Sequence, residues 1–232
     1  MKRFYKEATV RAVSGGWQVF LDDRGIKTQG GRPQVTPTEA LAAALSTEWA
    51  AQGEEIDPAR FAMRDMADFA IDVVAPDRGK AIDGLLRYAE TDTLCYRAEA
   101  GEPLAGRQTE LWEPLLKAAE ARWDVHFERI DGIIHRPQPV ATLARLRAVL
   151  EPRDDFVLSA LTTLASLAAS LTVALAATGP DADAEKLWAA ANLEEDWQAE
   201  LWGQDDEAVA LRNRRFTTFA TAMNFARLSE AS

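Results

Sequence analysis

The spacing of hydrophobic residues changes near residue 35, which divides the chain into two kinds of secondary structure. Before this point, apolar and polar residues alternate in the stretches 8–13 and 17–23, as they do in β-strands. Residues 14–16, with the sequence Ser-Gly-Gly, are typical of a hairpin turn between two such strands. A second turn is predicted at residues 23–25. The pattern predicts a small antiparallel sheet with three apolar side chains on one face, namely Trp17, Val19 and Leu21.

A helical period begins immediately after the predicted sheet. Thr36 is expected to be the N-cap, with Pro37 at the first helical position and Glu39 completing a capping box. Gly53 is expected to end this helix. Its apolar stripe, which we expect to pack on the preceding sheet, consists of Leu41, Leu45 and Trp49.

The remainder of the chain is predicted to be mostly helical. The segment 125–139 breaks this pattern and predicts a short hairpin or an extended loop about Asp131–Gly132. Pro114 is expected in a first turn or at a kink. We therefore predict an α+β fold, with a small N-terminal antiparallel β domain that includes one helix (1–60) and a larger all-helical domain (61–232). Three helices are predicted from their apolar stripes, which are Met66, Phe69, Ala70 and Val73; Ile82, Leu85, Leu86 and Ala89; and Leu111, Trp112, Leu115, Leu116, Ala119 and Trp123. Four further helices are predicted at residues 139–151, 153–178, 183–202 and 205–229.

One long stretch, residues 156–180, contains no charged residue and could by its length span a membrane. It is rich in Ala, Ser and Thr, and neither an aromatic belt nor a flanking basic cluster marks its ends. A helix that is apolar on all sides can instead be the central helix of a bundle. We expect a buried core helix and no membrane insertion.

Composition restricts the classes of function. The formal net charge of −11 argues against nucleic-acid binding, because phosphate recognition needs a basic surface. Apolar residues form 47% of the chain and charged residues 27%, as in an ordinary globular protein. One cysteine cannot form an internal disulfide, and the N-terminus lacks the apolar core of a signal peptide. We expect a bacterial-type cytoplasmic protein or an already processed organelle protein.

Residues suited to catalysis are few. The stretch "YAETDTLCYRAEAG" contains the single cysteine, Cys95, and the only histidines are His126 and His135. A thiol and an imidazole could meet in space, so a small thiol enzyme remains an alternative. A free cysteine is more often a small buried apolar group. No spacing matches a metal site or a phosphate-binding loop, so we expect no enzyme activity, no metal and no cofactor.

The most unusual composition lies in residues 181–207, which we call the acidic segment. It contains ten acidic residues and one basic residue, Lys186, so it accounts for −9 of the net charge. Three tryptophans also lie here, at positions 188, 197 and 202. They could pack inward behind a solvated helix face, or they could anchor a protein-binding surface. The helix that follows carries Arg212, Arg214 and Arg215, which could partly neutralise the acidic segment.

Several motifs resemble one known family, and they occur in the same order along nearly the whole chain. They are "RFYKEATV", "GGWQVFLDDRGIKT", "TPTEALAAALSTEWAAQ", "IDP", "FAID", "YAETDTLCYRAE", "PLAGRQTELWEPLL" and "LEEDWQAELWG". In them the chain resembles the ATP synthase F₁ assembly chaperones of mitochondria and α-proteobacteria that bind the α subunit. The chain departs from the family pattern at Gln29 and Arg64, where a proline is expected.

The resemblance implies an ATP-independent chaperone without enzyme activity, which holds the free F₁-ATPase α subunit until the β subunit replaces it. It also implies a bacterial cytoplasmic location, or the mitochondrial matrix for eukaryotic relatives, and we expect a monomer when free. A general holdase for unfolded proteins is a further alternative. The expected partner-binding residues are Glu194, Glu195, Trp197 and Trp202, while a structural role is expected for Trp49, Asp92, Cys95, Tyr96 and Arg97.

Overall fold

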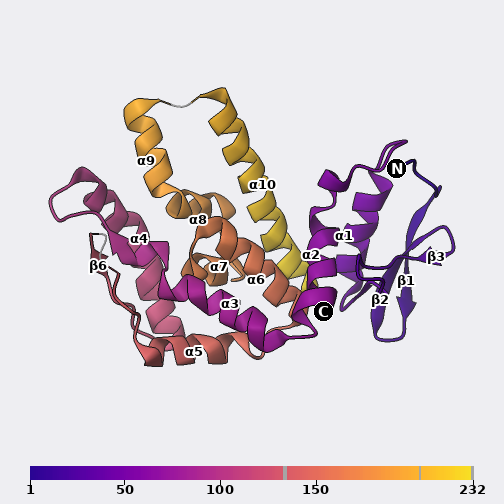
Figure 1. The fold of residues 1–232 in the computed structure, drawn as a ribbon, viewed down its shortest axis with the longest axis horizontal. Helices are drawn as coiled ribbons and strands as arrows, with labels where there is room; N and C mark the ends of the chain where they lie inside the picture. The colour runs from indigo at the N-terminus through magenta and orange to yellow at the C-terminus, as the bar shows by residue number, and fades with distance from the viewer. Residues whose placement is uncertain (133–134, 204, 231–232) are drawn as a thin grey trace. The chain divides into compact units, whose positions relative to one another are not determined.

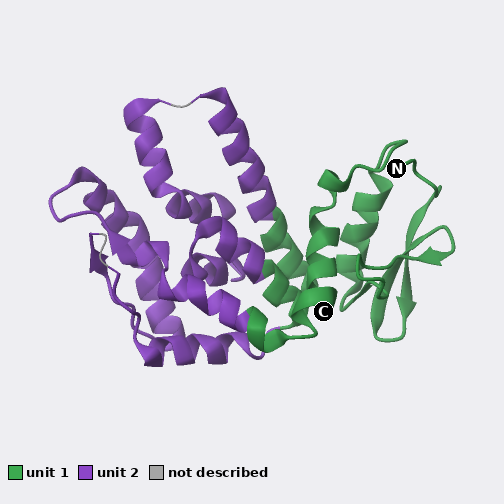
Figure 2. Ribbon diagram, in the orientation of Figure 1, with its two compact units in different colours: residues 1–81, 154–160, 221–232 green, residues 82–153, 161–220 purple. Residues whose placement is uncertain are grey.

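The structure, a computed structural model, describes residues 1–132, 135–203 and 205–230 and confirms the α+β fold (Figure 1). The chain forms two compact units, which Figure 2 shows in different colours. Unit 1 contains residues 1–81, 154–160 and 221–232, and unit 2 contains residues 82–153 and 161–220. The predicted domain boundary after residue 60 stays a prediction.

A four-stranded antiparallel sheet occupies the N-terminal part of unit 1. Strands β1 (Ala8–Val13) and β2 (Gly16–Leu21) form the predicted hairpin, in which Ala8 pairs with Leu21 and Val13 with Gly16. Strand β2 also pairs with β3 (Arg24–Gly25) and with β4 (Val35–Thr36). The alternation of side chains therefore predicted both long strands correctly.

The hairpin turn depends on glycine. Gly16 has a φ of 148°, and a Cβ there would lie only 2.2 Å from the carbonyl oxygen of Thr36. Any side chain at this position would force β4 away from β2. The second turn lies at Asp22 and Asp23, one residue before the predicted place, and Asp22 adopts a left-handed φ of 54°.

Helix α1 (Glu39–Ala50) carries the predicted apolar stripe, but its predicted N-cap is wrong. Leu41, Leu45 and Trp49 are buried, and the helix packs on β1 and β2 as expected. The N-cap is Thr38, whose hydroxyl oxygen accepts a hydrogen bond from the Leu41 N–H at 3.1 Å. Thr36 cannot cap the helix because it belongs to β4, where its hydroxyl donates to the Trp17 carbonyl at 3.1 Å. The helix also ends at Ala50 rather than at Gly53.

The next helix of unit 1 changes its winding. A 3₁₀ turn (Pro58–Arg60) leads into α2 (Ala62–Phe69), which continues as a π-helix from Ala70 to Val74. The π-turn holds more residues per turn, so it shifts the buried face by one position. Val73, predicted to continue the apolar stripe, is 51% exposed, whereas Val74 is fully buried.

Both departures from the family pattern place a backbone N–H where a proline would have none. The N–H of Gln29 donates to Asp68 Oδ2 at 3.1 Å. The N–H of Arg64 donates to Glu48 Oε2 at 2.9 Å, and that of Met63 donates to Glu48 Oε1 at 2.8 Å. Glu48 thereby caps α2 from α1, the preceding α-helix, and burial raises the pKa of its carboxyl against the opposing effect of these two donors.

Unit 2 is predominantly helical, as predicted. Two long predicted helices are interrupted, however. Pro114 lies inside α4, so a place in its first turn is wrong, while the alternative of a kink stays a prediction. The helices wholly or mostly in this unit are α3 (Arg78–Glu90), α4 (Pro103–Trp123), α5 (Val140–Leu150), α7 (Leu171–Ala177), α8 (Ala184–Ala191) and α9 (Leu193–Trp202). Helices α6 (Asp155–Ala168) and α10 (Asp206–Ser229) contribute residues to both units.

The irregular segment after α4 forms no hairpin within its described residues. Its strand β6 (Ile130–Asp131) instead pairs in parallel with β5 (Tyr96–Arg97), which follows the 3₁₀ turn Thr93–Cys95. The part of the hairpin prediction that falls on Ile133 and Ile134 lies outside the described residues. Chain segments more than thirty residues apart thus meet here.

The uncharged run forms two helices instead of the single helix predicted over 153–178. Its side chains are largely buried, as predicted, but Ala169 adopts a left-handed φ of 48° between α6 and α7. Ser170 then caps α7 by accepting a hydrogen bond from the Val173 N–H at 3.0 Å. In the described part of the chain, no helix combines the length and apolar character that crossing a membrane requires.

Candidate partner-binding site

The motif around Cys95 forms a buried cluster of hydrogen bonds, which we call the motif cluster (Asp92–Arg97). Asp92 is fully buried; its Oδ1 accepts from the Leu94 N–H at 3.1 Å, and its Oδ2 accepts from the Thr172 N–H at 2.9 Å. The N–H and the hydroxyl of Thr93 both donate to the carbonyl oxygen of Ala169, at 3.1 and 2.9 Å. These bonds satisfy the backbone groups that the break between α6 and α7 would otherwise leave unpaired.

The pKa of the Asp92 carboxyl is subject to two opposing effects, burial and hydrogen bonding. Burial raises its pKa, while hydrogen bonds from Ser170 and Thr172 to the carboxylate oppose that rise. Loss of this side chain would leave two buried N–H groups without acceptors. The structure places Asp92 where it joins two distant parts of unit 2.

Cys95 is poorly placed for a nucleophile. Its side chain has no exposed surface, and burial together with the nearby Asp92 raises the pKa of the thiol well above its usual range. His135 Nδ1 lies 2.8 Å from the Tyr96 hydroxyl, and His126 Nδ1 lies 3.4 Å from Glu120 Oε1. The neutral, enclosed thiol therefore opposes the thiol-enzyme alternative.

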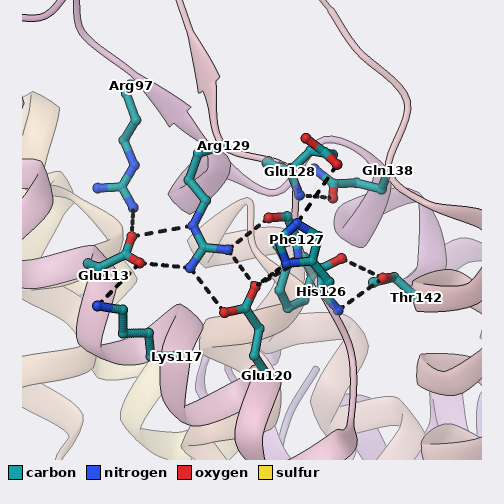
Figure 3. Close-up of polar contacts among 10 residues, drawn as sticks. All are labelled: Arg97, Glu113, Lys117, Glu120, His126, Phe127, Glu128, Arg129, Gln138 and Thr142. Atoms are coloured by element: carbon teal, nitrogen blue, oxygen red, sulfur yellow. Dashed lines mark hydrogen bonds and ion pairs between the residues drawn. The ribbon is translucent and has the colours of Figure 1, made fainter.

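An ion-pair network beside the motif cluster fixes β5 and β6 to α4 (Figure 3). Arg129 lies between two glutamates: its Nη2 is 2.9 Å from Glu113 Oε1 and 3.2 Å from Glu120 Oε2, and its Nη1 also pairs with Glu120. Glu113 Oε2 in turn accepts from Arg97 Nη2 at 3.2 Å. The guanidinium of Arg97 also lies 5.3 Å from the centre of the Trp112 ring.

The pKa values in this network follow from its contacts. Burial acts to raise the pKa of Glu120, but the hydrogen bonds from Arg129 and from the Phe127 N–H prevail and hold it below its ordinary value.

Further hydrogen bonds hold the segment that contains Arg129. Figure 3 shows Gln138 bonded to the backbone of Glu128, and Thr142 to that of His126. Within the described ranges, no group of three or more His, Cys, Asp or Glu side chains could hold a metal ion. The network holds the segment 126–131 in place.

The three tryptophans of the acidic segment differ in their exposure to solvent. Trp188 is buried and packs against Phe216 and Phe219, with ring centres 6.0 and 5.4 Å away. Trp197 is half-buried beneath the guanidinium of Arg107, which lies 4.7 Å from its ring. Trp202 is 78% exposed. Of the three, Trp202 therefore has the most surface to offer a partner.

Helix α9 is held in unit 2 mainly by polar contacts, since Leu193 is its only buried residue. Asp196 accepts two hydrogen bonds from Arg212, at 2.7 and 2.5 Å, and Glu195 lies 3.4 Å from Arg215. The arginines of α10 thus partly neutralise the acidic segment, as predicted. On the opposite flank, Arg107 pairs with Glu200 at 2.9 Å.

Sequence reasoning missed Gln108, which links α9 to Ala98, the residue that follows the motif cluster. Gln108 is fully buried; its Oε1 accepts from the Ala98 N–H at 2.7 Å, and its Nε2 donates to Glu194 Oε1 at 2.8 Å. The signal available was its position four residues before Trp112, on the stripe of α4 that faces the core. Trp112 itself donates from Nε1 to the Ala190 carbonyl at 2.7 Å.

A cleft of about 300 Å³ lies between the end of α9 and the beginning of α10. Leu201, which precedes Trp202 in the sequence, is 57% exposed. An exposed tryptophan, exposed aliphatic groups and carboxylates together form a surface suited to binding another protein. Residues that line the cleft include Glu195, Asp196, Trp202, Asp205, Ala208 and Arg212.

Comparisons with known proteins identify the family of the chain. A family model described as "ATP12 chaperone protein" matches residues 2–120. The mitochondrial protein atp12 of Schizosaccharomyces pombe is 25% identical over 224 residues, which cover 91% of this chain and 77% of that protein.

Solved structures match over nearly the whole chain. The crystal structure of Atp12 from Paracoccus denitrificans has a TM-score of 0.92 and 37% sequence identity, covering 99% of this chain and 98% of that one. A mutant of the same Paracoccus protein matches equally well, with a TM-score of 0.92 and 37% identity over the same shares of the two chains. The family resemblance found in the sequence motifs is confirmed.

Proposed function

Because the chain belongs to the ATP12 chaperone protein family, we propose that it is an ATP-independent assembly chaperone for the F₁-ATPase α subunit. The observation that carries this proposal is the exposed surface at the end of α9, where Trp202 and Leu201 lie among carboxylates. An unassembled subunit of a ring exposes a large apolar interface that tends to aggregate. Reversible binding prevents aggregation, and the β subunit then displaces the chaperone by mass action.

The partner-binding residues divide into two roles in this proposal. Trp202 and Glu195 touch the α subunit, since both are largely exposed. Glu194 and Trp197 position α9, because their contacts are with Gln108 and Arg107 of α4. The protein acts as a monomer in the bacterial cytoplasm.

Co-expression of the full chain with the isolated α or β subunit of its own F₁-ATPase tests the proposal. We expect the chain to keep the α subunit soluble and to co-purify with it, without a comparable effect on β. Trp202→Ala should reduce capture of α about tenfold or more, as is usual for a central aromatic anchor. Val140→Ala is the matched control, because Val140 is 84% exposed on α5, away from the acidic segment.

The other outcomes distinguish the alternatives. Equal protection of α, β and unrelated unfolded proteins would support a general holdase. Loss of function in Cys95→Ser with unchanged stability would support a thiol enzyme, whereas a chaperone should lose little. No effect on the α subunit at all would overturn the proposal.

A further inference from the structure

We propose that the cleft between α9 and α10 receives an arginine side chain that projects from an otherwise apolar segment of the partner. The inference rests on the proposed function for its choice of surface, and it adds the chemical class of the group that is recognised. It is carried by the charge in the cleft, by the exposed tryptophan beside it, and by an internal example of the same contact on α9.

The cleft has an excess of negative charge. Arg212 is the only cation among its lining residues, and it forms two hydrogen bonds with Asp196, at 2.7 and 2.5 Å, so these two groups neutralise each other. Glu195 and Asp205 remain. Glu195 is 63% exposed and forms an ion pair at 3.4 Å with Arg215, which does not line the cleft, while Asp205 is exposed and caps the Ala208 N–H at 2.7 Å. A positively charged group therefore complements the cleft.

Trp202 adds an aromatic wall, and its exposed ring favours a guanidinium. A cation over the face of a tryptophan is attracted by the ring quadrupole, and the planar, weakly hydrated arginine side chain stacks there better than lysine. The cleft of about 300 Å³ is at the small end of ligand-binding clefts, which suits one long side chain.

Helix α9 already binds one arginine in this way. The guanidinium of Arg107 lies 4.7 Å from the centre of the Trp197 ring and 2.9 Å from Glu200. Trp202 and Glu195 offer the same pair of groups, a tryptophan and a carboxylate, at the cleft. Exposed aliphatic side chains on the same two helices favour apolar neighbours in the bound segment. They are Leu201, Val209 and Leu211, none of which lines the cleft itself.

Fluorescence anisotropy with labelled peptides tests the inference on the full chain. The probes are four peptides that share one apolar frame and differ only in a central arginine, lysine, citrulline or glutamate. We expect the arginine peptide to bind best and the citrulline peptide, which has the same shape without the charge, to bind about tenfold more weakly. Trp202→Ala and Glu195→Gln should each weaken the arginine peptide several-fold. Glu185→Gln removes the same charge from the exposed start of α8 and should leave binding unchanged.

Each result supports or overturns the proposal. Equal binding of the arginine and citrulline peptides would overturn the proposal, since the charge of the guanidinium would then not be recognised. An unchanged affinity in Trp202→Ala would overturn it as well, since the peptide would then bind elsewhere. Capture of the α subunit is measured in parallel with the same variants. If wild type and both cleft variants capture α equally, the chaperone function stands and the cleft inference fails. If the arginine peptide binds at the cleft but α is not captured, the proposed function fails.

Discussion

The motif cluster and helix α9 both depend on polar side chains, but they use them in opposite ways. In the motif cluster, the carboxylate of Asp92 is fully buried and accepts backbone N–H groups from two parts of unit 2. In α9, four partly or fully exposed carboxylates pair with arginines or with the buried Gln108, and one residue of ten is buried. Buried polar groups with fixed partners determine a backbone path, whereas exposed ones can exchange one partner for another.

The largest effect is expected at Asp92. Asp92→Ala leaves the N–H groups of Leu94 and Thr172 buried without acceptors, and should lower the free energy of unfolding by about 3–5 kcal/mol. Urea-induced unfolding, followed by circular dichroism, measures the change. Asp181→Ala, at an exposed position, should alter it by less than about 0.5 kcal/mol. Similar midpoints for the two variants would contradict the role given to the motif cluster.

A smaller, pH-dependent effect is expected at Glu120. Its folded pKa lies below the ordinary value of 4.5, so its stabilising effect is complete above that pH and is lost as the pH falls through the folded pKa. Glu120→Gln should therefore lower the free energy of unfolding by about 1–2 kcal/mol at neutral pH, and the difference from wild type should disappear in acid. Glu110→Gln, exposed on the same helix, is the control. A difference that is independent of pH would show that the ion pair with Arg129 is not its cause.

The contacts of α9 should contribute less. A double-mutant cycle of Arg212→Gln and Asp196→Asn should give a coupling energy of about 0.5–1 kcal/mol, because the pair is only partly buried. Added salt should reduce this coupling. A coupling as large as the Asp92 effect, and insensitive to salt, would remove the distinction between the two regions.

The smallest effect on stability is expected at Trp202. With 78% of its surface exposed, Trp202→Ala should change the free energy of unfolding by less than about 0.5 kcal/mol. Trp112→Ala, which empties a fully buried position and removes a bond to the Ala190 carbonyl, should lower it by about 3–5 kcal/mol. Thermal unfolding of both variants tests the contrast, which fails if Trp202→Ala is also strongly destabilising.

Sequence reasoning predicted elements well where a single periodicity decided them. The hairpin of β1 and β2, the stripe Leu41, Leu45 and Trp49, and the stripe Ile82, Leu85, Leu86 and Ala89 all lie where the pattern placed them. It was wrong where a distant group competes with a local signal. Thr36 has every local mark of an N-cap, yet it pairs with β2, and Thr38 caps the helix instead.

The candidate site was predictable only in part. Composition located the acidic segment, but three tryptophans with similar local surroundings turned out to be buried, half-buried and exposed. The difference comes from Phe216, Phe219 and Arg107, which lie on other helices. The position of Gln108 on the core-facing stripe of α4 indicated that it would be buried, but not that it would link Glu194 of α9 to the backbone of Ala98.

The sequence by itself determined the fold class, the family and most of the buried helix faces, because these depend on periodicity and on the order of motifs. Tertiary structure alone decided where the long helices break and which polar groups remain available to a partner. The uncharged run can be interrupted at Ala169 because side chains nearly eighty residues earlier replace the missing helical hydrogen bonds. Thr93 donates to the Ala169 carbonyl, and Asp92 accepts from the Thr172 N–H. Hydrogen-bond partners so distant leave no periodic trace in the chain, so only the folded molecule reveals them.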